Sequence, residues 1–266
     1  MIVNFNLLAE LVKKDLKLRY SRPFLGFIWA FLSPLCVVAI FYLVFYLFLK
    51  VKIEEAPFIL YLMSAIFTWK IFADSLMGSV TSLVDNRNLI KESRFPQYLI
   101  PVSVVLANTI NALPSLALLL VCSAMILKGL PALVIFLPLV LLIQIIFTAN
   151  LAVIFSLLFV RWRDIKYMVE LSLMLLFYLI PNFYSLSLAK SSFSPALYMA
   201  YIYNPLVGIL NLYRSVFLKG YLGFALNEAG ISSLVLAPLI FLALGLALSI
   251  YLFRKLKDTI NDYISY

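Results

Sequence analysis

Residues 15–34, DLKLRYSRPFLGFIWAFLSP, decide the fold, because the chain passes there from a charged segment into an apolar one. Lys17, Arg19 and Arg22 precede the apolar part, and residues 24–49 carry no charge. Basic residues next to an apolar stretch mark the cytoplasmic side of a membrane span. The segment therefore predicts that the chain enters the membrane at this point from the cytoplasm.

The composition of the whole chain agrees with a membrane protein. Of the 266 residues 65% are hydrophobic and 12% are charged, whereas a soluble domain carries roughly a quarter charged residues. The sequence has no histidine, which excludes an imidazole base and a histidine-ligated metal site. Cys36 and Cys122 lie in apolar runs and are interpreted as small buried apolar side chains. Residues 1–22 lack the apolar core of a cleaved signal peptide.

Six segments are long and apolar enough to cross a hydrocarbon core that needs about 20 helical residues. They are expected at 27–49, 57–83, 99–127, 131–160, 167–187 and 232–253. Fourteen of the 21 Lys and Arg residues lie in the N-terminal segment, the second-to-third loop, the fourth-to-fifth loop and the C-terminal segment. The positive-inside rule then predicts an all-α polytopic protein, a single transmembrane domain over 1–266, with both termini in the cytoplasm.

Residues 4–19 have the periodicity of an amphipathic helix, with Lys13 and Lys17 on its polar face. Such a helix lies at a membrane interface, where it is either a plain anchor or a surface that a cytoplasmic partner binds. Asp15 and Arg19 interrupt its apolar face. Because they are four residues apart with the acid first, we expect them to form an ion pair.

Two connecting segments are also unusual. The loop 85–98, DNRNLIKESRFPQY, predicts a short helix that presents Asn88, Leu89, Ile90 and Glu92 to the cytoplasm, as a solvated connector or as a docking element. The segment 188–230 contains two apolar stretches too short to span, separated by Asn204 and Pro205. They predict a re-entrant helical hairpin packed against protein, with a lid on the outer leaflet as the alternative. Arg214 in the second stretch would be costly if it faced lipid.

Charged residues inside the expected spans are few. Lys70 and Asp74 in the second span lie four residues apart on one helical face, which predicts an ion pair with either a structural or a functional role. Glu170, close to Arg163 and Lys166, is interpreted as a satisfied interface residue. No series of Asp, Glu and His crosses the spans, which argues against a proton-driven carrier.

Aromatic residues gather in two of the expected spans. The first span contains Phe41, Tyr42, Phe45 and Tyr46, and the fifth contains Phe177, Tyr178, Phe183 and Tyr184. A tyrosine deep in a membrane needs a hydrogen-bond partner or a wet lumen. Rings that also carry hydroxyls suit sugars, although ordinary core packing is an alternative for any one of them.

Several short motifs occur in the order and places expected for a known family. They are Asp15, Leu16, Lys17, Arg19 and Tyr20 with Leu25, Gly26, Trp29 and Pro34; Asn88 to Lys91 with Phe95 and Pro96; Arg163, Asp164 and Ile165; and Asn204, Pro205 and Leu206 with Tyr213 and Arg214. With them the chain resembles, nearly from end to end, the permease subunits of bacterial polysaccharide exporters in the ABC type-2 transporter family, such as those for O-antigen and teichoic acid.

The resemblance implies a homodimer around a channel, with one of two ATPase subunits docked beneath each copy. Residues 4–19 would be an interface helix, 86–95 a coupling helix and 195–218 the gate helices on the outer side. The implied ATPase contacts are Lys13, Lys17, Asn88, Leu89, Ile90, Lys91 and Glu92. The implied channel residues are Phe41, Tyr42, Phe45, Tyr46, Phe177, Tyr178 and Tyr184, and the implied gate residues are Tyr203, Asn204, Pro205 and Arg214.

The chain contains no GxxxxGK[ST] motif, so ATP and Mg²⁺ are expected on the ATPase partner, and no cofactor, metal or enzymatic activity is expected in this chain. The implied cargo is a glycan linked to polyprenyl pyrophosphate in the bacterial inner membrane, with no role for nucleic acid. Arg19 and Arg22 are at headgroup level and could contact the pyrophosphate. Alternative cargoes within the same machinery are teichoic acid, capsule or a small lipid or drug.

Overall fold

The computed structural model describes residues 5–19, 23–92 and 95–265, without the side chains of residues 19, 23–31, 92 and 257–265. Every regular element in these ranges is a helix, and no strand is found in them. The prediction of an all-α protein is therefore confirmed.

The described part of the chain contains α1 (Phe5–Arg19), α2 (Pro23–Phe41), the π-helix η1 (Tyr42–Phe48), α3 (Phe58–Val80), α4 (Ser82–Asp85), α5 (Arg87–Glu92), α6 (Leu99–Ile126), the 3₁₀ helix η2 (Ala132–Phe136), α7 (Leu137–Arg161), α8 (Ile165–Leu179), α9 (Leu186–Ser192), α10 (Pro195–Ile202), α11 (Pro205–Phe217), α12 (Tyr221–Ile231), the π-helix η3 (Ser232–Leu236) and α13 (Ala237–Ser265).

Four helical stretches in the described residues are long and apolar enough to cross a membrane: Phe58–Val80, Leu99–Ile126, Ala132–Arg161 and Tyr221–Leu256. They coincide with the expected second, third, fourth and sixth spans, although the last begins earlier, at Tyr221 instead of Ser232. The place of the expected first span is taken by α2 and η1, of which Leu32–Phe48 forms a shorter apolar helix. The chain is thus helical and polytopic.

The expected fifth span does not continue to residue 187. Helix α8 ends at Leu179 after 15 residues, a length of about 22 Å. The cause is Pro181, whose ring disfavours a helical backbone at the residue before it, and Ile180 is accordingly extended (φ −79°, ψ 150°). Helical structure resumes only at Leu186, in α9.

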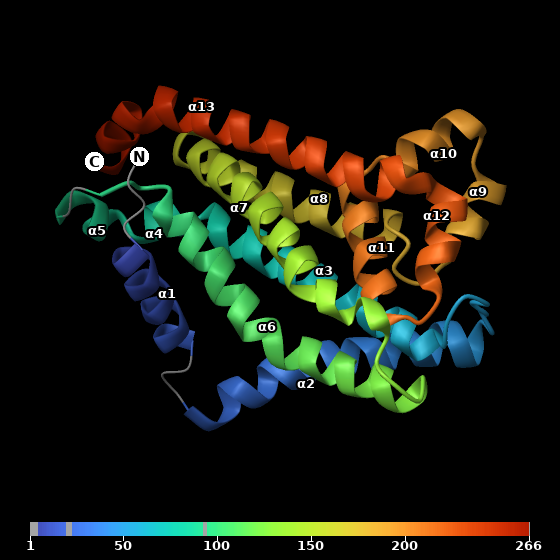
Figure 1. Cartoon of the computed structure of the whole chain (residues 1–266). Coiled ribbons are helices and arrows are strands. Elements are labelled where there is room, and N and C mark those ends of the chain that lie inside the picture. The colour runs from blue at the N-terminus through green and yellow to red at the C-terminus, as the bar shows by residue number, and fades with distance from the viewer. Residues whose placement is uncertain (1–4, 20–22, 93–94, 266) are drawn as a thin grey trace.

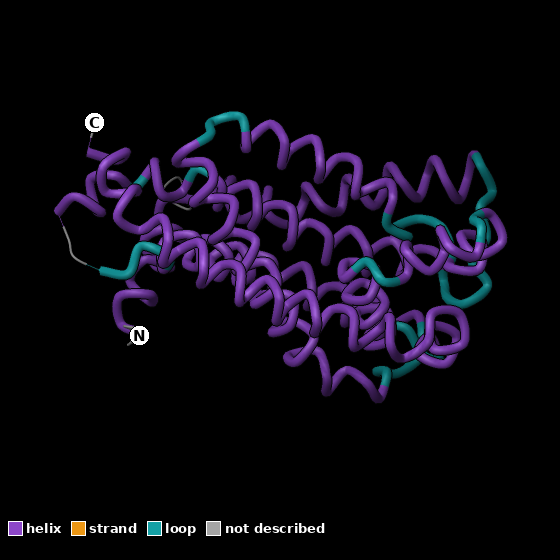
Figure 2. The backbone as a smooth tube through the Cα atoms, turned by 90° about the horizontal axis from the view of Figure 1, so that it is seen from above, coloured by secondary structure: helices purple, strands orange, loops and turns teal. Residues whose placement is uncertain are grey.

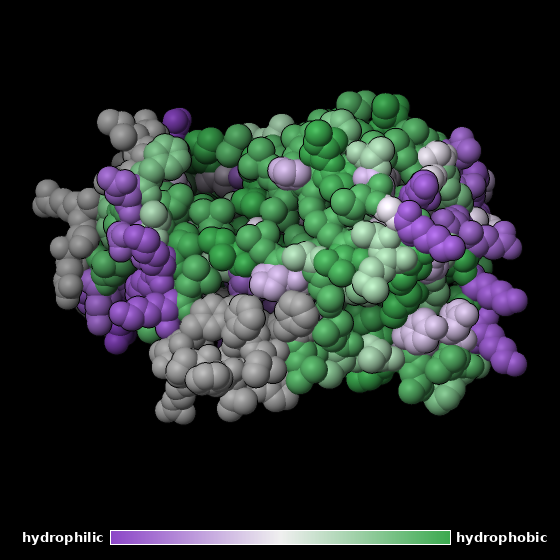
Figure 3. Space-filling model, turned by 60° about the horizontal axis from the view of Figure 1, so that its bottom comes forward, coloured by the Kyte–Doolittle hydropathy of each residue, from purple (hydrophilic) through white to green (hydrophobic). Residues whose placement is uncertain are grey.

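The long helices run between two ends of an elongated bundle (Figures 1 and 2). One end carries α1, α4, α5 and the C-terminal part of α13, whereas α9, α10 and α12 lie at the other. The beginning and the end of the chain are thus at the same end, as two cytoplasmic termini require. Figure 3 shows hydrophilic side chains gathered at both ends of the visible face, with a mostly hydrophobic belt between them. This pattern is typical of a protein that crosses a bilayer.

Helix α3 occupies the centre of the bundle and packs against α2, α6, α7, α8 and α11. In the apolar stretch that marks α3 as a span, 72% of the residues are buried within the chain. In the corresponding stretches of Ala132–Arg161 and Tyr221–Leu256, 22% are buried. Helix α13 packs along α7 and leaves most of its described side chains exposed, where lipid or another subunit would cover them, whereas twelve residues of α7 are buried. On α2, Cys36 is exposed, contrary to the expectation of a buried cysteine, while Cys122 is half-buried.

Candidate functional site

The N-terminal helix packs on protein as well as presenting a free face. Leu11 and Val12 are buried, and the helix lies against α6, where the hydroxyl of Ser103 donates to Asp15 over 3.1 Å. Phe5 and Leu18 are 75% and 65% exposed. The expected Asp15–Arg19 pair lies outside the described side chains. The amphipathic helix is therefore present, with only part of its apolar surface available to headgroups.

The polar face of α1 points away from the bundle. Lys13 and Lys17 are exposed, and Lys13 forms an ion pair with Glu10 at 2.7 Å. Lys14 donates to the side chain of Asn86 just before α5. The two elements expected to meet an ATPase are thus joined to each other by a polar contact. Arg22 and the side chain of Arg19 lie outside the described residues.

Helix α5 coincides with the expected coupling helix, but its orientation differs in one respect. Asn88 and Lys91 are exposed and Leu89 is partly exposed, whereas Ile90 is only 9% exposed. Ile90 packs in a cluster with Leu83, Ile100, Val153, Leu157 and Val160. The expectation that Ile90 faces the cytoplasm is wrong, because the one-turn helix needs an apolar anchor on the bundle. The side chain of Glu92 is not described.

The loop after α5 is fixed to the C-terminal helix. The ring of Tyr98 meets that of Phe253 edge to face at 5.2 Å, and Phe95 packs in the same cluster. The hydroxyl of Tyr98 is buried without a hydrogen-bond partner in the described chain, and burial raises its pKa. A displacement of α5 would therefore be transmitted directly to α13 and α6.

The aromatic residues predicted for a channel come together toward the end of the bundle that carries α9. Phe41 lies 5.6 Å from both Phe177 and Phe183, and Phe45 stacks on Phe183 at 4.6 Å between ring centroids. Tyr178 touches Phe177 and Phe183. The first and fifth expected spans thus share one aromatic cluster, with Phe183 at its centre.

Tyr42 and Tyr46 form a second, neighbouring stack on η1. Their rings are 4.8 Å apart, and that of Tyr46 stacks on Phe58 at 5.7 Å. Tyr46 and Tyr178 are 41% and 55% exposed, and among the described residues neither these two hydroxyls nor that of Tyr42 has a hydrogen-bond partner. By contrast, Tyr184 donates to the carbonyl of Leu179 at 2.6 Å and accepts from Tyr201. The three free phenols remain available for an external hydrogen bond.

The segment between α8 and α13 contains the two short helices predicted from its apolar stretches. Ser194 caps α10 and Asn204 caps α11, where the Asn204 side chain accepts from the Leu206 amide at 3.0 Å and Pro205 follows at the first helical position. Tyr203, which is partly exposed, shares a hydrogen bond of 3.1 Å with Ser232 of η3. Side-chain caps thus define both helices locally.

Arg214 is the most deeply buried cation. Its side chain is 0% exposed, its Nη2 donates to the carbonyls of Pro181 and, at 3.2 Å, Asn182, and its guanidinium carbon lies 3.4 Å from the Tyr61 ring centroid. No carboxylate of the described residues lies within 4 Å of it. These carbonyls are free to accept because Pro181 has ended α8. The expectation that Arg214 avoids lipid is met by full burial in protein.

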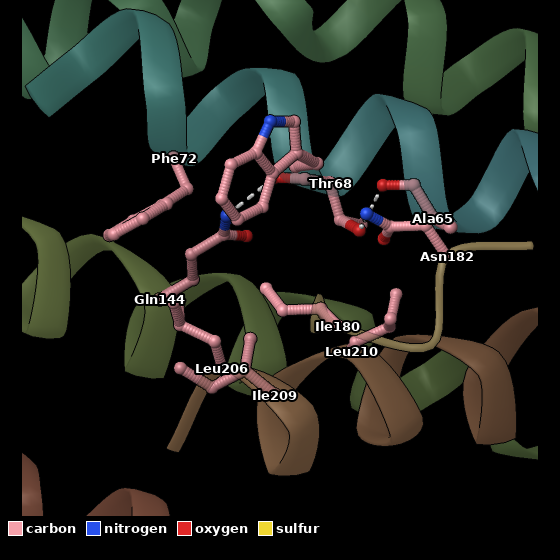
Figure 4. A pocket seen from close by; sticks show the side chains of 10 residues that line it. Ala65, Thr68, Phe72, Gln144, Ile180, Asn182, Leu206, Ile209 and Leu210 are labelled. Carbon is pink, nitrogen blue, oxygen red and sulfur yellow. Dashed lines mark hydrogen bonds between the residues drawn. The ribbon is translucent and has the colours of Figure 1, made fainter. Parts of the chain in front are cut away.

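A small, mostly apolar pocket with a few polar groups lies beside this break, between α3, α7 and α11 (Figure 4). Gln144 donates to the carbonyl of Thr68 at 2.9 Å across it. The side-chain oxygens of Gln144 and Asn182 are buried and have no donor in the described chain. The pocket therefore suits a small hydrogen-bond donor such as water.

Lys70 and Asp74 form the predicted ion pair at 2.8 Å on α3, with side chains 36% and 45% exposed. The Asp74 carbonyl accepts weakly from the buried side chain of Asn108 at 3.4 Å. Glu170, expected to be satisfied by nearby cations, has no ion-pair or hydrogen-bond partner in the described residues and is exposed on α8. No group of three or more Cys, Asp or Glu able to hold a metal occurs in the described part of the chain.

A family model described as ABC-2 type transporter matches residues 6–218, which include α1, the coupling region, the aromatic cluster and both short outer helices. The chain belongs to the ABC-2 type transporter family. The resemblance found in the sequence is thereby confirmed, as is the prediction of a transport subunit instead of an enzyme.

Curated relatives of this ABC-2 permease match along nearly its whole length. An O-antigen export system permease protein, RfbA, of Klebsiella pneumoniae is 33% identical over 95% of this chain and 93% of its own. A protein of the same name from Myxococcus xanthus is 33% identical over 79% of this chain and 80% of its own. The similarity therefore covers the membrane region and both ends.

The sequence did not reveal several residues of this permease that hold the candidate sites together. Tyr61 beneath Arg214, Ser103 opposite Asp15 and Gln144 across the small pocket are all distant in sequence from the groups that they contact. Their only sequence signal is polarity inside an apolar helix. A polar side chain at such a position is expected to need a hydrogen-bond or ion-pair partner, but the sequence does not show which residue that partner is.

Proposed function

We propose that this chain is the channel-forming subunit of an ATP-driven exporter that moves a lipid-linked, O-antigen-like polysaccharide across the bacterial inner membrane. The observation that carries the proposal is the near-complete coverage of two O-antigen export permeases of Klebsiella pneumoniae, at 33% and 32% identity. The fold agrees, since the described residues contain four apolar spans and the sequence contains no GxxxxGK[ST] motif.

The aromatic surface is the proposed path of the polysaccharide. Phe41, Phe45 and Phe177 supply apolar faces on which sugar rings stack, while Tyr42, Tyr46 and Tyr178 hold hydroxyls with no partner in the described chain. Stacking and single hydrogen bonds are individually weak. A polymer could exchange them from one sugar unit to the next and slide. Tyr184, whose hydroxyl already donates to the carbonyl of Leu179, would support the rings that line this path.

The proposed complex is a homodimer with two ATPase subunits. The docking surface comprises Asn88, Leu89 and Lys91 on α5 together with Lys13 and Lys17 on α1, all at the end of the bundle that carries the termini. Glu92, Arg19 and Arg22 belong to the proposal on sequence grounds, the first as an ATPase contact and the two arginines as contacts of the lipid pyrophosphate. Ile90 would transmit force from the ATPase to the bundle through its buried contacts.

Helices α10 and α11 are the proposed outer gate. Their connection, Tyr203, Asn204 and Pro205, touches η3 through the Tyr203–Ser232 hydrogen bond, and Arg214 fixes α11 to the end of α8. A movement of α8 would therefore be passed to α11. With this end outside the membrane, the termini and the cationic loops lie in the cytoplasm, in agreement with the positive-inside rule.

The decisive experiment reconstitutes the chain with its ATPase in lipid nanodiscs and measures ATP hydrolysis with and without polyprenyl-pyrophosphate-linked polysaccharide. The expected result is stimulation by the lipid-linked polymer, and not by the polyprenyl phosphate alone. Lys91→Glu should abolish the stimulation, because charge reversal at the docking surface costs favourable electrostatic contact with the ATPase.

Lys219→Glu provides the matched control, since Lys219 is an exposed lysine at the opposite end of the bundle. This variant should keep the stimulation. A permease that binds the ATPase but responds only to a small lipid would overturn the polysaccharide assignment. Equal stimulation of the two lysine variants would overturn the docking surface.

A further inference from the structure

A groove on the side of α3 that faces α8 combines carboxylates with aromatic rings. It is lined by Trp69, Ala73, Asp74, Met77, Glu170, Leu173, Met174, Phe177 and Tyr178. Asp74 lies six residues before the end of α3, and Glu170 five residues after the start of α8. At 1.5 Å per residue both carboxylates are within about 10 Å of the cytoplasmic ends of their helices. The groove is therefore among the first membrane-level surfaces that a cargo from the cytoplasm would meet.

The charges in this groove cannot face lipid without a large cost. Lys70 and Asp74 form an ion pair, yet each keeps more than a third of its side-chain surface exposed in the chain. Glu170 is exposed and has no partner among the described residues. Ionised side chains within a span face protein or a water-filled cavity. The groove is thus expected to face an aqueous path.

The rings in the same groove provide apolar contact next to these polar groups. The Trp69 and Phe177 rings are 5.7 Å apart, and the Tyr178 ring lies 5.3 Å from that of Phe177. Tyr178 adds a hydroxyl that has no partner in the described chain. A sugar has an apolar face and a rim of hydroxyls, and each hydroxyl both donates and accepts. Rings flanked by carboxylate acceptors match the apolar face of the sugar and the donor groups of its rim.

Resting on the proposed function, we propose that this groove is a carbohydrate subsite. In it Asp74 and Glu170 accept hydrogen bonds from sugar hydroxyls, and Trp69 and Tyr178 stack on the rings. The ligand is an uncharged, hydroxyl-rich segment of the polysaccharide rather than its pyrophosphate. The two carboxylates would repel an anion, and the residues that line the groove include no Lys or Arg.

A purely structural role for the ion pair makes a different prediction. Replacing both partners of an ion pair with apolar residues leaves no charge unpaired and removes the cost of desolvating two charges. The double variant Lys70→Leu/Asp74→Leu should therefore fold with its ATPase as the native chain does. If the groove binds sugar, the same variant should lose at least tenfold in export of the lipid-linked polysaccharide extracted from the source strain, measured in proteoliposomes.

Glu170→Gln tests the groove without disturbing packing, because the side chain is exposed and unpaired. We expect about a fivefold rise in the polysaccharide concentration that gives half-maximal ATPase stimulation. Glu54→Gln, an exposed glutamate in the outer loop, is the matched control and should leave this concentration unchanged. The pair Lys190→Ala/Glu228→Ala removes an ion pair of 3.1 Å at the outer end and should leave export unchanged.

A cysteine experiment distinguishes a sugar-filled groove from a subunit contact. In a Cys36→Ser/Cys122→Ser background, Asp74→Cys should react with a membrane-impermeant thiol reagent, and the lipid-linked polysaccharide should slow the reaction. Protection without polysaccharide, or a disulfide between two copies, would assign the groove to the dimer contact and overturn the subsite. Native export by Lys70→Leu/Asp74→Leu would also overturn it, whereas absence of export in the unmodified complex would refute the proposed function itself.

Discussion

The two ends of the bundle are held together in different ways. At the end that we propose to face outward, the outer end, Arg214, Tyr61, Tyr213, Phe217 and Tyr221 are all 0% exposed, and a single guanidinium joins α3, α11 and the break after α8. At the opposite end, the proposed cytoplasmic end, α1 is fixed by the buried side chains of Leu11 and Val12 and by polar contacts of Lys14 and Asp15 at the surface. The outer end is thus built around a buried cation, whereas α1 at the other end is held by two aliphatic side chains and surface polar contacts.

This difference follows from what each end must contact. Outside the spans, helices α9 to α11 at the outer end are too short to be stable alone, so they depend on burial against the rest of the chain. The cytoplasmic helices leave Phe5, Leu18 and several lysines unburied, a surface suited to headgroups and to a protein partner. We therefore expect mutations at the outer end to act mainly on stability, and those at the cytoplasmic end mainly on coupling.

The largest effect is expected for Arg214→Ala. The change leaves the carbonyls of Pro181 and Asn182 without a donor and opens a cavity above Tyr61, at a cost of about 3 kcal/mol in the free energy of unfolding. Thermal unfolding in detergent, followed by size-exclusion chromatography, measures it. Arg254→Ala, an exposed arginine at the cytoplasmic end, should change stability by less than about 0.5 kcal/mol.

Equal melting temperatures of these two arginine variants would show that the outer end does not depend on its buried cation. The inferred difference in stability between the two ends of the bundle would then be wrong.

Ile90→Ala should have the second largest effect, and it should act on both properties. Truncating this anchor removes apolar contacts with Leu83 and Ile100 and costs about 2 kcal/mol. Because α5 would then move against the bundle, stimulation of the ATPase should fall even at temperatures where the permease is folded. Leu89→Ala on the more exposed side should keep thermal stability. A fully coupled Ile90→Ala variant would show that force passes through another contact.

Gly208→Ala tests packing at the outer end alone. A Cβ atom at Gly208 would lie 2.6 Å from Cγ of Pro238 and 2.8 Å from the backbone oxygen of Ser233. The backbone cannot move away without separating α11 from η3, so overpacking should cost about 1.5 kcal/mol. Gly223→Ala is the control, since nothing lies within 4 Å of its added Cβ. A lower melting temperature for Gly223→Ala than for Gly208→Ala would contradict the close contact.

The sequence predicted those parts of the fold that depend on local composition. Apolar length placed α3, α6, α7 and α13, and Asn204 with Pro205 marked the start of α11 because capping is a local interaction. The end of α8 was also readable, since Pro181 lies inside the expected fifth span. There the continuous hydrophobicity of residues 167–187 was given more weight than the proline, and the predicted span was too long.

The missed features depend on contacts between distant segments. Ile90 was predicted to face outward because a six-residue helix does not show which side meets the bundle. The sequence also did not indicate that Ser103 of α6 donates to Asp15, while the expected pair of Asp15 with Arg19 stays a prediction because it lies outside the described side chains. Polarity inside an apolar span correctly identified Lys70, Asp74 and Arg214 as residues that need partners. The spacing of four residues also predicted the ion pair of Lys70 and Asp74. Nothing in the sequence indicated that backbone carbonyls bind Arg214.

The smallest effect is expected for Ser103→Ala. Its hydroxyl donates to Asp15 at 3.1 Å and to the carbonyl of Ile100 at 2.8 Å, so its loss weakens one polar contact that holds α1 on α6, at about 1 kcal/mol or less. The measurement is the rate of limited proteolysis between α1 and α2, which should rise because α1 dissociates more often. Ser172→Ala removes only a bond within α8, to the carbonyl of Met168, and should not change that rate. Identical rates would mean that the Ser103 hydroxyl does not hold α1, which Leu11, Val12 and the Lys14–Asn86 contact would then fix to the bundle.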